Sequence, residues 1–333
     1  MKPIIEVKNL SIDFKVKNGI LRACDKISIT INDGEILGII GESGSGKSTF
    51  ASGILNLVAN PGVISEGQII YHTKDGESVD LLSLSQREYS KYRWTHLASV
   101  FQAAQNALNP VLTIKDHFLE TAWAHDSKIK REEVISKAKK IMKQVRLEER
   151  VLDYYPHQLS GGMKQRAIIA LSLLLDPEIL ILDEPTTALD VITQWYIIDI
   201  LRKIHNESGI TMIFLTHDVS IIGSIVDRIG VMYAGQVVEC GDVEDVFKNP
   251  SHPYTYGLMH AVPSLHDDIS KRKAISGYPP DLLNLPDRCR FSERCMFYIS
   301  GRCQGDKERT DKLYPVKEGW YSRCYLWREV LKL

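Results

Sequence analysis

The chain has 333 residues, of which 44% are hydrophobic and 25% are charged, and its 41 Lys and Arg residues against 42 Asp and Glu residues give a formal net charge of −1. This ordinary globular composition excludes a disordered chain, a collagen-like chain and a disulfide-dense miniprotein. The length predicts a principal domain plus a smaller second unit. The near-neutral charge argues against nucleic acid as the main partner, because proteins that neutralise a nucleic-acid backbone usually carry a strongly basic domain or stripe.

The first 60 residues predict an antiparallel sheet followed by the start of an α/β core. Apolar and polar residues alternate over 4–14 and again over 27–31, and the turn signals are Asn18-Gly19 and Asp33-Gly34. A short buried strand is expected at 35–40 (EILGII), followed by a glycine-rich loop and a helix.

The rest of the chain predicts further α/β structure and a different C-terminal part. No secretory signal begins the sequence and no apolar run approaches the roughly 20 residues of a membrane span, so a cytoplasmic location is expected. After Pro250 the composition shifts toward Pro, Tyr, Arg and Cys, which indicates an appended segment. The elements expected in between are an inserted helical subdomain from about 103 to 160, a buried strand at 178–185, a helix near 192–206, a strand at 211–218, and a hairpin at 229–241 with its turn at Ala234-Gly235.

The glycine-rich loop GESGSGKST at 41–49 matches G-x-x-x-x-G-K-[ST] and lies between a strand and a helix, as a phosphate-binding loop does. Gly44 and Gly46 allow backbone N–H groups to face phosphate oxygens, Lys47 would reach the β and γ phosphates, and Ser48 would place its hydroxyl on Mg²⁺. A chance glycine-rich turn is disfavoured because strand, loop and helix all agree. The ATP-binding residues predicted from this loop are Gly41, Ser43, Gly44, Ser45, Gly46, Lys47, Ser48 and Thr49.

Two acids follow the buried strand at 178–185. Asp183 would support Mg²⁺, and Glu184 could polarise the attacking water as a general base. A pair of acids at a strand end is more often a solvated turn, but the phosphate-binding loop in the same chain favours the functional interpretation.

A second anion-binding segment, LSGGMKQR at 159–166, opens a helix. Ser160 can donate a hydrogen bond from its hydroxyl to an anion, and Gly161 and Gly162 leave backbone amides accessible at the helix N-terminus. This segment resembles the signature motif of the ABC ATPases, which contacts ATP bound to the opposite subunit. The resemblance implies that Leu159, Ser160, Gly161, Gly162 and Gln165 take that role here.

The same resemblance implies roles for four further residues. Gln102 resembles the glutamine that senses Mg²⁺ and water and links the core to the helical subdomain. Asp190, in ALD, resembles the D-loop residue that faces the dimer partner, and His217 resembles the switch histidine on the γ phosphate. Phe14 lies where the family carries an aromatic that stacks on adenine, although it could equally be a core residue.

Several longer segments resemble the ATP-binding subunits of dipeptide and oligopeptide importers, among them HQLSGGMKQR at 157–166 and NPSHPYTYGLMHAVPSL at 249–265. The resemblance implies an α/β fold: a P-loop RecA-like ABC ATPase core in 1–248, with an antiparallel β subdomain and the helical insertion, and a Cys-rich extension in 249–333. It also implies ATP and Mg²⁺ as cofactors and attachment to the cytoplasmic face of the membrane.

The partners that the resemblance implies are two transmembrane permease subunits, an extracytoplasmic substrate-binding protein, and a paralogous ATPase in a heterodimer or a second copy in a homodimer. Two alternatives stay open at this point. Related importers carry oligosaccharides or nickel, and a soluble ABC ATPase would act without a membrane partner.

Four of the six cysteines crowd the C-terminal segment, with the spacing Cys289-x5-Cys295-x7-Cys303-x20-Cys324. Persistent disulfides are disfavoured in the cytoplasm, so metal binding is the leading explanation, and four thiolates suit either Zn²⁺ or an iron–sulfur cluster. Some relatives hold a [4Fe–4S] cluster in a similar C-F-x-x-R-C-like run, which favours the cluster here. Zn²⁺ and four free thiols remain alternatives.

Overall fold

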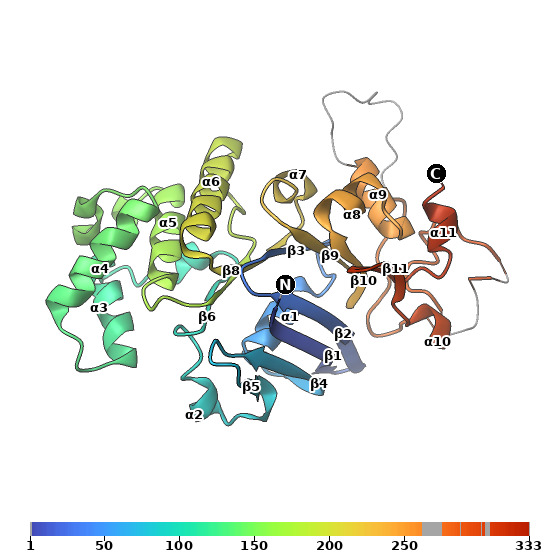
Figure 1. Ribbon diagram of the computed structural model, residues 1–333, viewed down its shortest axis with the longest axis horizontal. Coiled ribbons are helices and arrows are strands. Elements are labelled where there is room, and N and C mark those ends of the chain that lie inside the picture. The colour runs from blue at the N-terminus through green and yellow to red at the C-terminus, as the bar shows by residue number, and fades with distance from the viewer. Residues whose placement is uncertain (1, 262–274, 287, 301, 304–306, 333) are drawn as a thin grey trace. The chain divides into compact units, whose positions relative to one another are not determined.

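The computed structural model describes residues 2–261, 275–286, 288–300, 302–303 and 307–332. The chain forms two compact units: residues 1–83 together with 214–333 make the first, and residues 84–213 make the second. Strand β8 (Thr211–Thr216) contains the point where the chain returns from the second unit to the first (Figure 1). The proposed boundary at 248/249 remains a prediction. Among the described residues, no helix is both long enough and apolar enough to cross a membrane.

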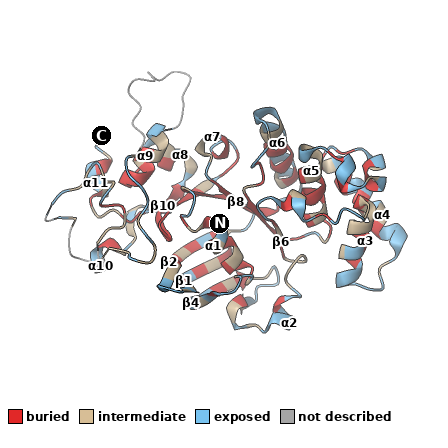
Figure 2. Ribbon diagram, turned by 180° about the vertical axis from the view of Figure 1, so that it is seen from behind, coloured by how far each residue is buried: buried red, intermediate tan, exposed pale blue. Residues whose placement is uncertain are grey.

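An antiparallel sheet with the strand order β2-β1-β4-β5 opens the first unit, as the alternation predicts (Figure 1). The first hairpin pairs Val16 with Gly19, so its turn falls one residue before the expected Asn18-Gly19. Figure 2 shows the mixture of buried and exposed residues along these strands, which is the signature of a sheet with one covered face. The strands are β1 (Pro3–Val16), β2 (Gly19–Asn32), β4 (Gly62–His72) and β5 (Ser78–Asp80).

The α/β part of the first unit is built around β3 (Ile36–Ile40), all of whose residues are buried. It runs parallel to β9 (Arg228–Tyr233), which forms the expected hairpin with β10 (Gln236–Asp242). The turn residues Ala234 and Gly235 both have positive φ values, 47° and 81°, as a tight hairpin turn requires. The helices of this unit are α1 (Lys47–Ile54), α7 (Val219–Ile222), α8 (Val243–Lys248), α9 (Pro253–Ala261), α10 (Lys307–Thr310) and α11 (Trp327–Val330), with a 3₁₀ turn at Leu81–Ser83.

The C-terminal segment extends this same sheet. Strand β12 (Trp320–Ser322) pairs antiparallel with the free edge of β10, and β11 (Tyr314–Lys317) pairs with β12. The buried carboxylate of Glu239 on β10 accepts hydrogen bonds from the Ser251 N–H at 2.8 Å and hydroxyl at 2.6 Å, from the His252 N–H at 2.9 Å and from the Trp320 indole at 2.9 Å. The segment is therefore anchored by strand addition and by a fully paired buried acid.

The second unit contains two parallel strands and the longest helices of the described chain. Strands β6 (Leu97–Val100) and β7 (Ile179–Asp183) pair from Leu97↔Ile179 onward, and β7 is buried throughout. The expected helix-forming stretch contains α3, which starts with a Thr113–Asp116 capping box. The helices are α2 (Gln86–Tyr89), α3 (Ile114–His125), α4 (Arg131–Gln144), α5 (Gly161–Ser172) and α6 (Val191–Ser208), with 3₁₀ turns at Ala104–Asn106, Glu149–Asp153 and Pro156–Gln158.

Candidate nucleotide site

The phosphate-binding loop connects β3 to α1 in the first unit, where the sequence predicts it. Gly44 and Gly46 have φ values of 79° and 102°, in the region that side chains rarely adopt. A Cβ on Gly46 would also lie 2.5 Å from the carbonyl oxygen of Ala23, a backbone atom that cannot move aside cheaply. The tight turn that opens α1 therefore requires glycine at position 46.

Lys47 and Ser45 make the inner surface of the loop polar. Lys47 is 5% exposed, and its Nζ donates to the carbonyl oxygens of Gly41 at 2.7 Å and Glu42 at 3.1 Å. The buried hydroxyl of Ser45 has no hydrogen-bond partner among the residues that the structure describes. A buried ammonium inside a turn of glycines, next to an unsatisfied hydroxyl, fits an anionic phosphate chain.

The β9–β10 turn packs against the phosphate-binding loop. The Gly235 N–H donates to the Ser45 carbonyl at 2.9 Å. A Cβ on Gly41 would lie 2.2 Å from the Met232 carbonyl oxygen. The loop and this turn are thus in direct backbone contact.

In the second unit, Glu184, which follows the end of β7, contacts the predicted glutamine. Asp183 is buried at 4% exposure, and the next residue, Glu184, has a φ of 49° that ends the strand. The Glu184 Oε2 accepts from the Gln102 Nε2 at 3.0 Å and from the Thr187 Oγ1 at 2.9 Å. The positive φ of Glu184 strains its backbone, and such strain persists only where surrounding contacts hold the residue in place. The hydrogen bonds from Gln102 and Thr187 are such contacts.

Thr187 is a site residue that sequence reasoning did not find. Its hydroxyl donates to the carboxylate of Glu184. A threonine three residues after Glu184 is not by itself a pattern that predicts this contact. Gln102 and Glu184, in contrast, were both predicted, and the structure brings them together across 82 residues of sequence.

The LSGG segment and Asp190 lie side by side in the second unit. The Ser160 Oγ caps α5 by accepting from the Met163 N–H at 3.3 Å, and Asp190 caps α6 by accepting from the Thr193 N–H at 2.9 Å and hydroxyl at 2.7 Å. The Thr193 hydroxyl and N–H hold the pKa of Asp190 below its usual value. A Cβ on Gly162 would lie 2.7 Å from the Thr193 Cγ2, so the two helix starts touch.

A groove of about 380 Å³ runs between these two helix starts. Ser160 and Gly161 are exposed at the groove, whereas Leu159 and Gln165 are only 6% and 3% exposed. Leu159, which precedes α5, and Gln165 on α5 are therefore both buried within the chain. Their contact with a partner's nucleotide stays a prediction.

Two further residues of the predicted nucleotide site lie in the first unit. His217 follows β8 directly and is exposed. Phe14 on β1 is half-buried, and a Cβ on Gly62 of the neighbouring strand β4 would lie 2.7 Å from the edge of its ring. Phe14 thus packs against β4 with part of its ring and leaves the rest open, and its role in adenine stacking stays a prediction.

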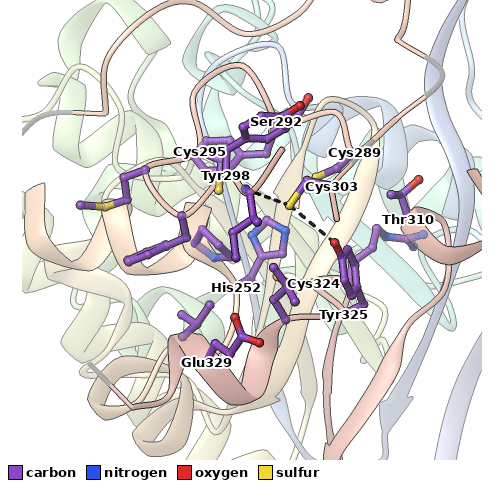
Figure 3. A pocket seen from close by; sticks show the side chains of 18 residues that line it. His252, Cys289, Ser292, Cys295, Tyr298, Cys303, Thr310, Cys324, Tyr325 and Glu329 are labelled. Atoms are coloured by element: carbon purple, nitrogen blue, oxygen red, sulfur yellow. Dashed lines mark hydrogen bonds between the residues drawn. The ribbon is translucent and has the colours of Figure 1, made fainter. Parts of the chain in front are cut away.

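The four C-terminal cysteines line one cavity of about 340 Å³ (Figure 3). The Cys303 Sγ accepts a hydrogen bond from the Ile299 N–H at 3.5 Å and one from the Tyr325 hydroxyl at 3.7 Å. Burial raises the pKa of the thiols of Cys289, Cys295 and Cys324, that of Cys295 to about 12, so these groups are protonated at neutral pH unless a metal displaces the proton.

The expected metal site is not confirmed by the described residues. Within the described ranges, no group of three or more His, Cys, Asp or Glu side chains is placed to hold a metal ion. The four thiols line the cavity without converging on one point. A single tetrahedral Zn²⁺ would require them to converge.

Two known protein families match different parts of the chain. Residues 24–187 match the family described as ABC transporter, and residues 238–303 match the family described as the C-terminal region of oligopeptide/dipeptide transporters.

Curated relatives match along nearly their whole length. A dipeptide transport ATP-binding protein of Caldanaerobacter subterraneus is 43% identical over 330 residues, which cover 99% of this chain and 98% of that protein. An oligopeptide transport ATP-binding protein of Haemophilus influenzae is 38% identical over 335 residues, which cover 100% of both.

Two solved structures match most of the chain. The ATP-binding cassette MJ0796, solved as a dimer in a post-hydrolysis state with ADP and Pi, is 31% identical with a TM-score of 0.61 and covers 72% of this chain and 98% of its own. The protein cbiO1 from Clostridium perfringens is 29% identical with a TM-score of 0.63 and covers 74% of this chain and 92% of its own.

Proposed function

The chain belongs to the ABC transporter ATP-binding proteins of the dipeptide and oligopeptide import family, and from this membership we propose that it hydrolyses ATP to drive peptide uptake. It is the ATP-binding subunit of an importer and an ATP hydrolase. The observation that carries the peptide substrate is the match of residues 238–303 to a C-terminal region shared by oligopeptide and dipeptide transporters.

The chemistry that we propose uses the described residues in separate roles. Lys47 and the loop amides bind the β and γ phosphates, and the Ser48 hydroxyl and Asp183 support Mg²⁺, which neutralises developing charge on the phosphates. Glu184 accepts the proton of the attacking water, with Gln102 and Thr187 holding its carboxylate.

The motion that we propose is closure of two ATPase subunits on ATP. Ser160 and Gly161, which are exposed at the α5 N-terminus, would contact the γ phosphate of ATP held by the partner, and Asp190 would face the same partner. ATP therefore favours the closed pair by a contact that ADP cannot make, and hydrolysis releases it. Dimeric cassettes among the similar structures support this arrangement.

The partners in this proposal are a paralogous ATPase or a second copy, two permease subunits and an extracytoplasmic binding protein, with the chain attached to the cytoplasmic face of the membrane. The test is purification of the membrane-extracted complex through this chain, followed by a ligand screen on the co-purified binding protein. We expect di- and oligopeptides to bind. A binding protein that takes only oligosaccharides or nickel would overturn the peptide assignment, and a chain without permease partners would favour the soluble ATPase.

We also propose that the four cysteines hold an iron–sulfur cluster. A cluster has several iron atoms, so it requires thiolates arranged around a space, and Cys289, Cys295, Cys303 and Cys324 all line one cavity (Figure 3). Hydrogen bonds to the ligand sulfurs, such as those that Cys303 accepts, help to set the reduction potential of a cluster. The cluster would bind the C-terminal loops together.

Anaerobic purification tests the cluster. We expect a visible charge-transfer absorption together with about four iron and four sulfide per chain, as a Cys₄-ligated [4Fe–4S] group contains. The Cys289→Ser/Cys324→Ser double variant should lose the absorption. One bound zinc per chain, or four titratable thiols in the freshly purified protein, would show that the proposal is wrong.

A further inference from the structure

The segment between the first two cysteines of the C-terminal cluster lies against the phosphate-binding side of the first unit. We call residues 289–295 the cysteine loop. Arg290 of this loop donates to the Ala234 carbonyl at 2.5 Å and pairs with the buried carboxylate of Asp25. Ala234 belongs to the β9–β10 turn that supports the phosphate-binding loop. One end of the cysteine loop is thereby fastened next to the nucleotide site.

The other end of the cysteine loop contacts the phosphate-binding loop itself. The Arg294 guanidinium donates to both carboxylate oxygens of Glu42, at 2.8 Å and 2.9 Å, in a bidentate pair. The Arg294 side chain is 6% exposed and that of Glu42 27%, so solvent screens this pair less than a surface pair. Arg294 also donates to the Tyr233 hydroxyl at 3.3 Å and the Ser276 carbonyl at 3.0 Å, which fix its orientation.

Glu42 is held by its backbone as well. Its N–H donates to the hydroxyl of Tyr254 on α9 at 2.9 Å. Tyr254 packs against Tyr233 and Phe291, with ring centroids 4.5 Å and 5.4 Å away. Phe291 is itself a buried member of the cysteine loop. The C-terminal segment therefore fixes both the main chain and the side chain of Glu42.

These contacts lead to the group that binds phosphate. The Glu42 carbonyl accepts from Lys47 Nζ, so moving Glu42 would displace an acceptor that orients the lysine. The loop also contains three glycines at positive φ, whose backbones have wide conformational freedom. The buried, unsatisfied Ser45 hydroxyl costs free energy that contacts from outside the loop must offset.

We propose that Arg294 is a positioning residue for ATP: through Glu42 it holds the phosphate-binding loop in its nucleotide-binding conformation, and it couples ATP binding to the order of the cysteine loop. This inference rests on the proposed ATP site. The coupling is reciprocal by thermodynamic linkage. If the ordered cysteine loop raises the affinity for ATP by a given factor, bound ATP shifts the equilibrium toward the ordered cysteine loop by the same factor.

The test compares Arg294→Gln with Arg288→Gln in the full chain. Arg288 pairs with Glu293 at 2.9 Å and makes no ion pair with the phosphate-binding loop, so it is a matched control beside the same cysteines. We expect Arg294→Gln to weaken Mg-ATP binding about tenfold in a fluorescent-nucleotide competition titration, because the binding-competent loop becomes a minor population. Arg288→Gln should bind like the wild type.

A second readout separates positioning from general damage. In hydrogen exchange, Mg-ATP should slow the exchange of amides in 288–295 in the wild type and in Arg288→Gln, and this protection should be lost in Arg294→Gln. A merely structural role would lower the melting temperature without nucleotide but leave the affinity of the folded fraction unchanged, and that result would overturn the proposal.

Two further outcomes keep the inference separate from the ATP site. A wild-type chain that fails to bind Mg-ATP would contradict the proposed site as a whole, whereas wild-type binding with no change in Arg294→Gln contradicts only the positioning role. If Arg294→Gln does not fold, Glu42→Gln removes the same bidentate pair from the other side and should show the same tenfold loss. Unchanged affinity in that variant would also overturn the proposal.

Discussion

Replacing Glu184 with glutamine is expected to lower steady-state ATP hydrolysis by about 10²- to 10⁴-fold while leaving Mg-ATP binding intact. The amide keeps the shape of the side chain and one oxygen that can accept from Gln102 or Thr187, but it cannot take the proton of the attacking water. The measurement is phosphate release at saturating Mg-ATP, together with a binding titration on the same preparation.

The control for Glu184→Gln is Glu207→Gln. Glu207 lies on α6 in an exposed pair with Lys203, so the same chemical change there should leave hydrolysis at the wild-type rate. If Glu184→Gln bound ATP normally and hydrolysed it at the full rate, Glu184 would not be the general base.

Replacing Lys47 with alanine is expected to weaken Mg-ATP binding by about 100-fold, because a charge-assisted contact to two phosphates is lost from a buried position. The substitution also removes the hydrogen bonds to the Gly41 and Glu42 carbonyls, so the phosphate-binding loop should loosen as well. Competition titration against a fluorescent nucleotide measures the change.

Lys15→Ala, an exposed change on β1, is the matched control and should bind ATP like the wild type. The two substitutions at the site separate binding from chemistry: Lys47→Ala should weaken ATP binding, whereas Glu184→Gln should bind ATP normally and hydrolyse it slowly. Wild-type affinity in Lys47→Ala would contradict the assignment of residues 41–49 as the phosphate-binding loop.

Local patterns predicted most of the strands and the phosphate-binding loop, because their signals lie within a few residues. The β9–β10 hairpin has its turn at Ala234-Gly235 as expected, and Lys47 begins α1 immediately after the glycines. The joint occurrence of motifs, and not any single residue, also singled out Gln102 and Glu184, which the structure joins by a hydrogen bond.

Contacts that depend on three-dimensional packing could not be predicted in the same way. Arg294 and Glu42 are separated by 252 residues, and neither belongs to a pattern that would connect them. The burial of Gln165 follows from the packing of α5, which a motif match does not show. The crowding of cysteines did predict a shared location, but the sequence spacing could not tell that the thiols surround a cavity.

We expect ATP hydrolysis by this chain to power import, and the movement of labelled peptide across vesicle membranes that contain the purified transporter measures this. With binding protein and peptide in the lumen and Mg-ATP outside, where the ATPase subunits face, labelled peptide should leave the lumen. This transport should depend on ATP, and a complex carrying Glu184→Gln should bind ATP and transport no peptide. Peptide movement at the wild-type rate with Glu184→Gln, or without ATP, would contradict the account.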